Sequence, residues 1–203
     1  MNQKILFEIK KFTGSPVFFT DRSKILNIGK VIKTLPKNTI IIIREYDLDT
    51  NSREIFAKKI ISVARDQALK TLVGKDFSLA RKIKADGVHF SDLDTLPLQF
   101  FRKKSFPKKF IFSFSCHDEK SFLKWRKLSP NLLFISPIFP TTSHVNAKVF
   151  GLKNLAKFVA KNMNSDASPS PIYALGGINS ANLQSIRKLG ITGFGAINFF
   201  KNL

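Results

Sequence analysis

Short apolar runs rich in branched and aromatic residues recur along the whole chain. Most of them are continuously apolar and do not alternate with polar residues, which is typical of strands buried on both faces of a parallel sheet. The pattern predicts eight strands, at residues 16–20, 39–45, 70–74, 86–90, 109–115, 131–139, 171–177 and 193–199.

Segments with a helical spacing of apolar residues separate these runs. Clear examples are predicted at residues 52–69, 77–87, 117–129 and 180–190. In the first of them, the apolar positions at helical spacing are Ile55, Phe56, Ile60 and Val63. The last is expected to begin with Ser180 as its capping residue and to end at a glycine.

Eight strands that alternate with helices over 203 residues favour an α/β fold, a single (β/α)8 TIM barrel. The alternative is a doubly wound open sheet, but a GxGxxG motif after the first strand is absent. We expect residues 1–203 to form one domain. Residues 1–15 are predicted to be an N-terminal helix or extension, and residues 161–171 a polar surface loop.

The composition indicates a globular protein of a reducing compartment. Hydrophobic residues make up 43% of the chain, yet there is no apolar run long enough to span a bilayer and no secretory signal, so we expect a cytoplasmic protein without a membrane partner. Cys116 is the single cysteine, which excludes an internal disulfide framework. We expect it to be a small buried side chain and not a nucleophile, because no basic group is evidently paired with it.

The formal net charge of +20 favours anionic partners. The basic residues are spread over nearly every segment that looks helical, which is typical of solvated helix faces. Nucleic acid is not the expected partner, because the chain shows no RNP, helix-turn-helix or zinc motif. Attraction of phosphorylated metabolites is the remaining interpretation of the charge.

Polar residues and glycines follow the apolar runs at the points where a barrel carries its chemistry, the carboxyl ends of the strands. They are Arg44 and Glu45, His89 with Ser91, Asp92 and Asp94, Ser115 with Cys116 and His117, Thr141 to His144, Gly176 and Gly177, and Asn198.

Three of these groups have a structural and a functional interpretation. Asp92 and Asp94 either cap the next helix or supply oxygen ligands to one Mg²⁺ with a substrate diphosphate. Gly176 and Gly177 lie where the seventh loop of a barrel commonly receives a phosphate on its backbone N–H groups. His117 is either packed in the core or lines a pocket, and its polar surroundings favour the pocket.

The order of these motifs resembles that of the thiamine phosphate synthase and TenI superfamily. The resemblance starts at the first strand and extends to the C-terminus, over about 180 residues. It is carried by "FFTDR", "IIIREYD", "ARKIKADGVHFSDLD", "FSCHDEKSF", "SPIFPTTSH" and "IYALGGINSANLQSIRKLGITGFGAI".

The resemblance implies a thiamine-biosynthesis transferase that joins hydroxymethylpyrimidine diphosphate to thiazole phosphate and releases diphosphate with the help of Mg²⁺. The residues implied to contact the pyrimidine diphosphate are Arg44, Ser115, Thr141 and Ser143. Those implied to surround the thiazole phosphate are Gly176, Gly177 and Asn198. Asp94 is implied to hold the metal.

The chain departs from the family pattern around the diphosphate. A glutamine, a lysine, an Asn-Asp pair, the glycine that opens the sixth loop and the lysine that closes it correspond here to Ile42, Tyr46, Gly74-Lys75, Ser136 and His144. One of two metal-binding carboxylates is therefore replaced by Lys75. Its ammonium would lie where a cation sits, which predicts either diphosphate binding with little metal or a site that no longer binds diphosphate.

The TenI branch offers an alternative function, the metal-free isomerisation of a thiazole carboxylate phosphate. There the histidine that corresponds to His117 shuttles a proton, a role that suits a side chain titrating near neutrality. The catalytic candidates of the chain are therefore His117, Ser115 and His144, with His89 as a further helper. A non-catalytic protein that binds phosphorylated ligands is the third interpretation, and the sequence leaves the oligomeric state open.

Overall fold

The computed structural model describes residues 3–96, 109–141, 148–163 and 171–202. Eight parallel strands form a closed barrel in the order of the sequence, and β1 pairs with β8 to complete the ring. The strands are β1 Val17–Phe19, β2 Ile40–Ile43, β3 Lys70–Gly74, β4 Gly87–Ser91, β5 Ile111–Cys116, β6 Leu132–Ile135, β7 Ile172–Leu175 and β8 Gly193–Ala196. The predicted (β/α)8 barrel is confirmed.

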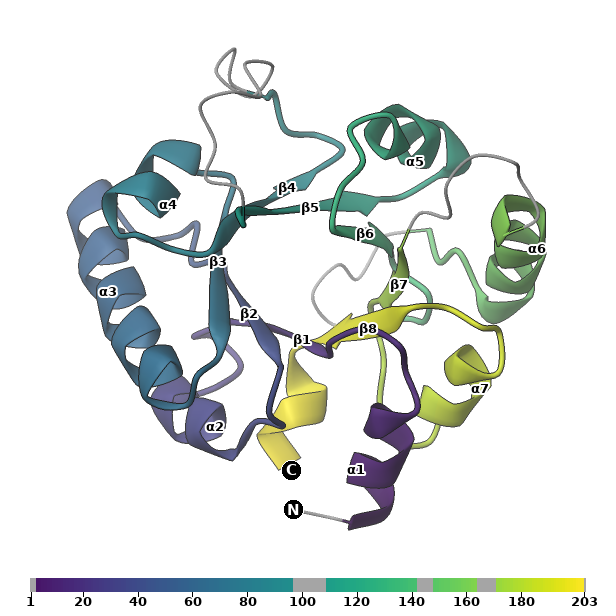
Figure 1. The fold of residues 1–203 in the computed structure, drawn as a ribbon, viewed down its shortest axis with the longest axis horizontal. Helices are drawn as coiled ribbons and strands as arrows, with labels where there is room; N and C mark the ends of the chain where they lie inside the picture. The colour runs from purple at the N-terminus through teal and green to yellow at the C-terminus, as the bar shows by residue number, and fades with distance from the viewer. Residues whose placement is uncertain (1–2, 97–108, 142–147, 164–170, 203) are drawn as a thin grey trace.

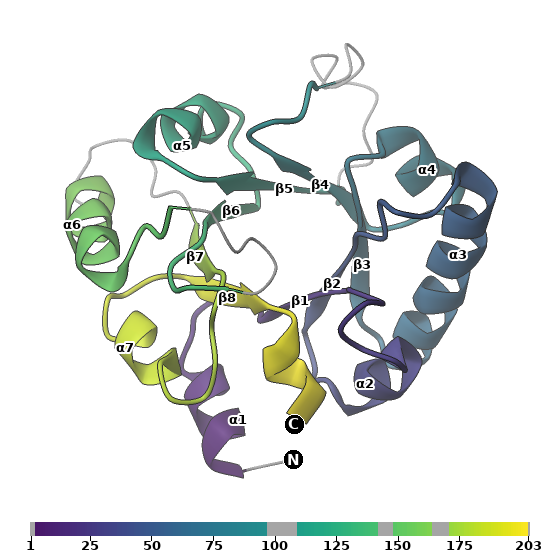
Figure 2. The same cartoon turned by 180° about the vertical axis from the view of Figure 1, so that it is seen from behind.

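Helices surround this ring on the outside (Figures 1 and 2). They are α1 Gln3–Lys10, α2 Ile28–Thr34, α3 Thr50–Asp66, α4 Phe77–Lys82, α5 Glu119–Arg126, α6 Leu152–Met163 and α7 Leu183–Arg187. The surface loop predicted at residues 161–171 is partly wrong, because α6 continues to Met163. The apolar residues Leu155, Phe158 and Val159 of α6 are three or four positions apart, so they share one face of the helix, and they are buried.

Two predicted strands end earlier than their apolar runs. The run 131–139 leaves the sheet at Ile135, before Ser136 and Pro137, because proline has no N–H to donate to a ladder. The run 193–199 leaves it at Ala196, and a 3-10 helix, Asn198–Asn202, follows. Apolar residues beyond both points are still buried, so hydrophobicity alone did not mark the ends of the strands.

Of the four apolar positions predicted at helical spacing in α3, Ile60 is buried, Phe56 and Val63 pack against the core, and Ile55 does not. Ile55 is 70% exposed, whereas Ala57, Ile60, Ile61 and Ala64 are buried. These four residues recur at intervals of three and four, so they share one face of a helix. Small alanines on this face let the helix lie close to the strands, and the bulkier Ile55 points away.

Ser180 does not cap α7, contrary to the sequence prediction. The helix begins at Leu183, and Ser180 lies in the preceding turn. That turn is held by two asparagines: the side chain of Asn179 accepts from the N–H of Asn182 at 3.1 Å, and Asn182 accepts from the N–H of Asn179 at 2.9 Å. An asparagine pair that bonds the local backbone in this way replaces the serine cap.

The N-terminal segment is a helix that packs on the barrel. Ile9 is buried, and the ring of Phe12 lies 5.3 Å from that of Phe194 on β8. The N–H of Gly14 donates to the carbonyl of Thr192 at 2.8 Å. The predicted N-terminal helix is therefore confirmed, and it lies beside the start of β8.

Aromatic rings fill the inside of the barrel. Phe19, Phe134 and Tyr173 belong to one buried cluster with aliphatic side chains from β1, β2, β3, β5 and β6. The ring of Phe134 lies 5.3 Å from that of Phe19 and 5.2 Å from that of Tyr173, at the separations that aromatic pairs prefer. The inside of the barrel is thus a packed core.

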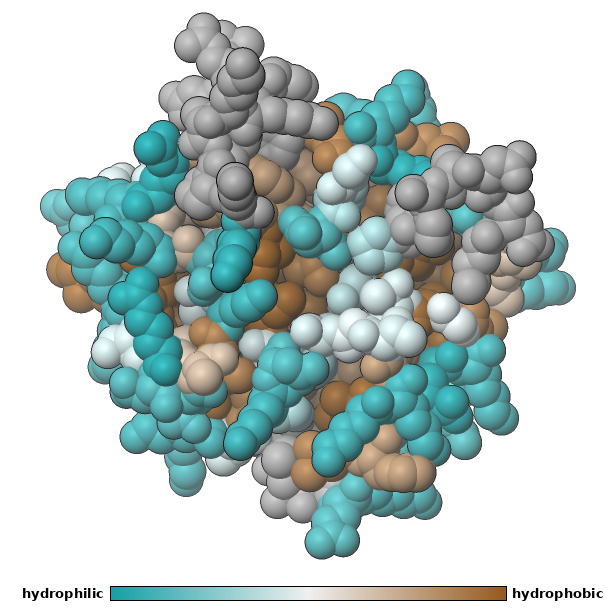
Figure 3. All heavy atoms as spheres, in the orientation of Figure 1, coloured by the Kyte–Doolittle hydropathy of each residue, from teal (hydrophilic) through white to brown (hydrophobic). Residues whose placement is uncertain are grey.

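Charged residues lie mainly on the circumference. Figure 3 shows hydrophilic side chains around the edge of the molecule, with smaller and more apolar residues toward the centre of this face. Among the described residues, no lysine or arginine is in the buried class. The prediction of solvated basic helix faces is confirmed for this part of the chain. In the same part of the chain, none of the helices has the length and apolar character needed to cross a membrane.

The glycines after β7 lie close to the loop after β6. Gly176 and Gly177 have φ angles of +93° and +67°. A Cβ at Gly177 would be 2.5 Å from the carbonyl oxygen of Pro140, and one at Gly176 would be 2.7 Å from Cβ of Pro137. The two loops can therefore meet only because both residues lack a side chain.

We predict that Gly177→Ala destabilises the protein more than Gly151→Ala does. Gly151 has a φ of +82° with nothing near its Cβ position, so its substitution measures the cost of the backbone conformation alone, about 1 kcal/mol. At Gly177 the clash with Pro140 should add roughly 1–3 kcal/mol. Urea unfolding of both variants tests this, and equal losses would contradict the close packing of the two loops.

Candidate functional site

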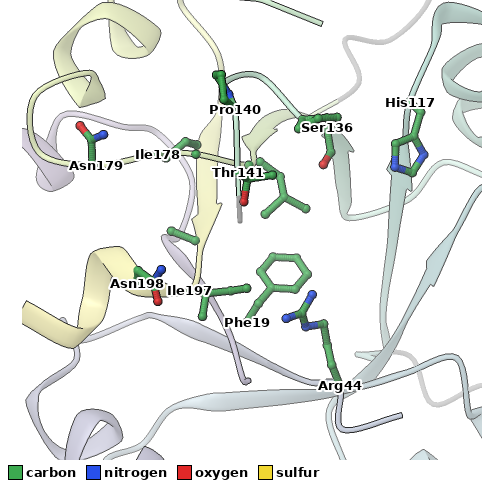
Figure 4. A pocket seen from close by; sticks show the side chains of 15 residues that line it. Phe19, Arg44, His117, Ser136, Pro140, Thr141, Ile178, Asn179, Ile197 and Asn198 are labelled. Atoms are coloured by element: carbon green, nitrogen blue, oxygen red, sulfur yellow. The ribbon is translucent and has the colours of Figure 1, made fainter. Parts of the chain in front are cut away.

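A cavity of about 300 Å³ opens at the carboxyl ends of the strands. It brings together six residues that the sequence predicted for the site, namely Arg44, His117, Thr141, Gly176, Gly177 and Asn198. Phe19 and Asn179 also line it, and sequence reasoning missed both. Figure 4 shows His117 and Asn198 on opposite sides of the cavity, and Arg44 beside Phe19.

One side of the cavity is made by the loops after β7 and β8. Gly176, Gly177 and Asn179 come from the first loop, and Asn198 from the second. The side-chain amide of Asn182 donates to the carbonyl of Gly177 at 2.9 Å and holds the loop in place. Glycines without side-chain bulk and two amide side chains form a surface of hydrogen-bond donors, as a phosphate requires. The pattern "GGIN" could have identified Asn179, because it directly follows the glycines.

Arg44 forms the opposite side of the cavity, at the end of β2. Its Nε donates to the carbonyl of Thr20 at 3.1 Å, and its Nη2 lies 3.2 Å from Oδ2 of Asp21. The guanidinium carbon is 5.8 Å from the centre of the Phe19 ring. These contacts fix the guanidinium, which carries five N–H donors, so it can offer further donors to an anion in the cavity.

A buried carboxyl group lies behind Arg44. Glu45 is 4% exposed, and the hydroxyl of Thr20 donates to its Oε2 at 2.7 Å. Its Oε1 has no hydrogen-bond partner among the described atoms. Burial raises the pKa of Glu45 above its ordinary value, while the Thr20 hydrogen bond and the charge of Arg44 oppose this rise.

His117 and Asp92 form a hydrogen-bonded pair at the edge of the cavity. Nδ1 of His117 lies 2.8 Å from Oδ1 and 2.9 Å from Oδ2 of Asp92, and the backbone N–H of His117 donates to Oδ2 at 3.2 Å. Because a carboxylate accepts the Nδ1–H, Nε2 of the neutral imidazole is left as a proton acceptor. The predicted pocket position of His117 is confirmed by its place in the cavity wall.

His89 lies below the cavity and remains neutral. Burial lowers its pKa to about 3, and the positive charges of Arg44 and Lys75 act in the same direction. Its Nδ1 is 2.8 Å from the hydroxyl of Ser113, and its Nε2 is 3.2 Å from that of Ser115. Ser115 is buried in this network and does not line the cavity, so its predicted contact with substrate remains a prediction.

Cys116 is inert, as expected from the sequence. The side chain is buried next to the helix α5, and burial raises the pKa of its thiol, with the negative charge of Asp92 acting in the same direction. A thiol in this environment is neither a nucleophile nor a metal ligand, because both roles need the thiolate.

Asp94 forms an ion pair with a lysine. Its Oδ1 is 3.1 Å from Nζ of Lys75, and its Oδ2 accepts from the N–H of Ser91 at 2.6 Å and from the hydroxyl at 2.9 Å. Asp92 is engaged by His117. The segment that follows these aspartates lies largely outside the described residues, at 97–108, so their predicted role in capping the next helix stays a prediction.

The donors around Asp94 do not fit a magnesium ion held by protein carboxylates. The described residues contain no group of three or more histidine, cysteine, aspartate or glutamate side chains arranged to hold a metal. The carboxylate of Asp94 already forms an ion pair with the ammonium of Lys75. The positive charge of this ammonium repels a divalent cation. The role of Asp94 as a metal ligand thus stays a prediction.

Two predicted site residues cannot be placed. Ser143 and His144 lie outside the described residues, between Thr141 and residue 148. Thr141 itself lines the cavity. The contacts predicted for Ser143 with diphosphate and for His144 in catalysis therefore stay predictions.

We predict that Glu45→Gln stabilises the protein at neutral pH. The folded state binds the Glu45 proton more tightly than the unfolded state, so the free energy of unfolding falls as the pH rises above the ordinary pKa of 4.5. Glutamine keeps an acceptor for Thr20 without ionising. The temperature at which the variant unfolds should be higher than that of the wild type at pH 7 and should approach the wild-type value below pH 4.5.

Glu119→Gln, which removes a carboxylate from the surface, controls for the change in net charge in that measurement. A Glu45→Gln variant that is less stable than the wild type at pH 7 would contradict the cost of burying this carboxylate.

Relatives from several bacteria match the chain over most of its length. "Putative thiamine-phosphate synthase 2" of Aquifex aeolicus is 31% identical over 187 residues, which cover 89% of this chain and 94% of that protein. "Thiamine-phosphate synthase" of Desulfitobacterium hafniense strain Y51 is 31% identical over 163 residues, which cover 79% of this chain and 74% of that protein.

The fold also matches solved structures. "Thiamine phosphate pyrophosphorylase from Pyrococcus furiosus" superimposes with a TM-score of 0.74 at 22% identity, over 93% of this chain and 88% of that one. The family model described as "Thiamine monophosphate synthase" matches residues 18–199, which include every strand of the barrel except the first residue of β1. The chain therefore belongs to the thiamine monophosphate synthase family.

Proposed function

We propose that this barrel is a thiamine phosphate synthase, which joins hydroxymethylpyrimidine diphosphate to thiazole phosphate and releases diphosphate. The observation that carries the proposal is the cavity, with donors for one anion after β7 and β8 and a fixed guanidinium after β2. Two anionic substrates that meet between these sides are the ligands that such an arrangement suits. The names of the curated relatives support the same reaction.

The reaction needs anion stabilisation and no net proton transfer. The bond between the pyrimidine methylene carbon and the diphosphate oxygen breaks, and its electron pair leaves with the diphosphate. The lone pair of the thiazole nitrogen then forms the new carbon–nitrogen bond and gives a thiazolium. Arg44 donates hydrogen bonds to the departing charge, and the loop with Gly176 and Gly177 fixes the thiazole phosphate, so both reactants are held in one orientation.

A second candidate function rests on the His117–Asp92 pair. An imidazole that a carboxylate orients, with Nε2 as acceptor, is suited to carry a proton to or from carbon. This is the chemistry of a metal-free thiazole tautomerase of the TenI type. The synthase remains the leading proposal because the chain keeps Arg44 on the diphosphate side of the cavity.

We predict that purified protein forms thiamine phosphate from the two substrates, with one diphosphate released per product. Arg44→Gln should lower kcat/KM for the pyrimidine diphosphate about 100-fold, since one fixed donor to developing charge is lost. Arg65→Gln, at the exposed end of α3, is the matched control and should retain the wild-type value. Quantifying product and diphosphate by chromatography gives both results.

His117→Ala separates the two candidate functions. A synthase should keep its coupling rate within about tenfold, because no proton is transferred, whereas a tautomerase should lose exchange of solvent deuterium into thiazole carboxylate phosphate. Absence of coupling together with deuterium exchange that depends on His117 would overturn the synthase proposal.

A further inference from the structure

We infer that Lys75, paired with Asp94, is a built-in cation that binds the diphosphate group of the substrate without a metal. The inference rests on the proposed synthase function, and it concerns how that site handles its anionic leaving group. The ammonium of Lys75 lies 3.1 Å from the carboxylate, at the end of β3. Lys75 corresponds to the carboxylate that the family resemblance expects to bind a metal, and the donors described at this point do not suit magnesium.

Three departures from the family pattern form one structural unit around this ammonium. Gly74 has no side chain, and a Cβ there would collide with the phenol of Tyr46. The Tyr46 ring occupies the space that the glycine leaves, and Nζ of Lys75 lies 4.9 Å from its centre. A cation at this distance from an aromatic face is stabilised by the ring. Tyr46, Gly74 and Lys75 therefore depend on one another, as expected of an organised site.

The backbone of Lys75 is also fixed. Its φ of +61° is in the left-handed region, which a lysine rarely adopts, and its N–H donates to the carbonyl of His89 at 2.7 Å. This conformation turns the side chain at the end of β3 toward Asp94, which follows β4. A strained position of this kind is maintained where the surrounding structure determines it.

The exposures of the two partners suit a bound anion. The side chain of Asp94 is 12% exposed and is held by Ser91, whereas that of Lys75 is 45% exposed. Asp94 thus positions the ammonium from below, and the ammonium faces solvent. An ammonium has three N–H groups, so its contact with Asp94 leaves it able to donate to phosphate oxygens.

Lys75 lies beside Arg44 on the rim of the barrel. Ile43 of β2 pairs with Val73 of β3, so Arg44 and Lys75 follow neighbouring strand ends. Arg44 is paired with Asp21 in the same way as Lys75 is paired with Asp94. In a closed ring of eight strands, β2 and β3 lie opposite β6 and β7, so the strand ends that carry Arg44 and Lys75 lie across the ring from the glycine loop, and Arg44 itself lines the cavity. The two sides match the diphosphate of one substrate and the phosphate of the other.

In the coupling reaction, Lys75 acts on the leaving group. As the carbon–oxygen bond breaks, the electron pair and its charge move onto the diphosphate, and the Lys75 ammonium donates hydrogen bonds to those oxygens. The ammonium keeps its protons, and the thiazole nitrogen supplies the electron pair of the new bond. The step balances without a metal or another reactant.

The first test measures binding of inorganic diphosphate by calorimetry in EDTA, which requires no catalysis. Wild-type protein should bind, and Lys75→Asn should weaken binding at least tenfold; asparagine tolerates the left-handed backbone, so the fold is retained. Lys84→Asn is the matched control, since Lys84 is an exposed lysine with a φ of +54°, and it should bind like the wild type. Circular dichroism checks that all three proteins are folded.

The second test measures coupling with EDTA or with Mg²⁺. Wild-type rates should agree within about threefold, whereas Lys75→Asp, which restores a second carboxylate beside Asp94, should need Mg²⁺ for activity. Asp94→Asn should lower the wild-type rate in EDTA by less than tenfold, because Asp94 positions the ammonium and does not touch substrate. Loss of coupling and of diphosphate binding by the wild type in EDTA, with both restored by Mg²⁺, would overturn the inference and leave the synthase function standing.

A second combination of results distinguishes failure of the proposed synthase function from failure of the proposed Lys75 site. If no condition yields thiamine phosphate, the synthase function fails, yet diphosphate binding in EDTA that depends on Lys75 and not on Lys84 would still uphold the metal-free anion site.

Discussion

The packed interior of the barrel is the constraint on which the site depends. Closure of β1 onto β8 leaves no strand edge and forces one set of side chains inward, where Phe19, Phe134 and Tyr173 fill the space. Gly195 of β8 accommodates these rings, since a Cβ there would touch both Phe19 and Phe134. The filled interior makes the floor of the cavity, so a ligand in this cavity is held by residues at the strand ends.

Two different sets of donors are available at those strand ends for the anions of the proposed reaction. After β7 and β8, the chain uses backbone and amide donors, and the close approach of the β6 and β7 loops fixes their positions. After β2 and β3, it uses the side-chain cations Arg44 and Lys75, each fixed by a carboxylate. Pairing each cation with a carboxylate holds its side chain in one place, which lowers the entropy lost when an anion binds.

The positions of individual charges therefore account for the proposed anion site better than the net charge of +20 does. Among the described residues, the lysines and arginines lie outside the buried core, and many are on the outer helices. Arg44 and Lys75 differ from those surface cations in their fixed positions at the barrel mouth. Burial keeps His89 neutral, and the charges of Arg44 and Lys75 also disfavour its protonation.

The sequence by itself determined the order of the eight strands, because runs buried on both faces are continuously apolar, and it determined which strand ends carry polar groups. The tertiary structure decided the strand ends at Ile135 and Ala196, the exposure of Ile55 and the burial of Ser115, since each depends on neighbours distant in the sequence. It also decided the partners: Lys75 with Asp94, and His117 with Asp92, meet only because parallel strands bring their carboxyl ends to one rim. The sequence shows which residue types follow each strand, but the pairing of the strands determines which of these charged residues are neighbours.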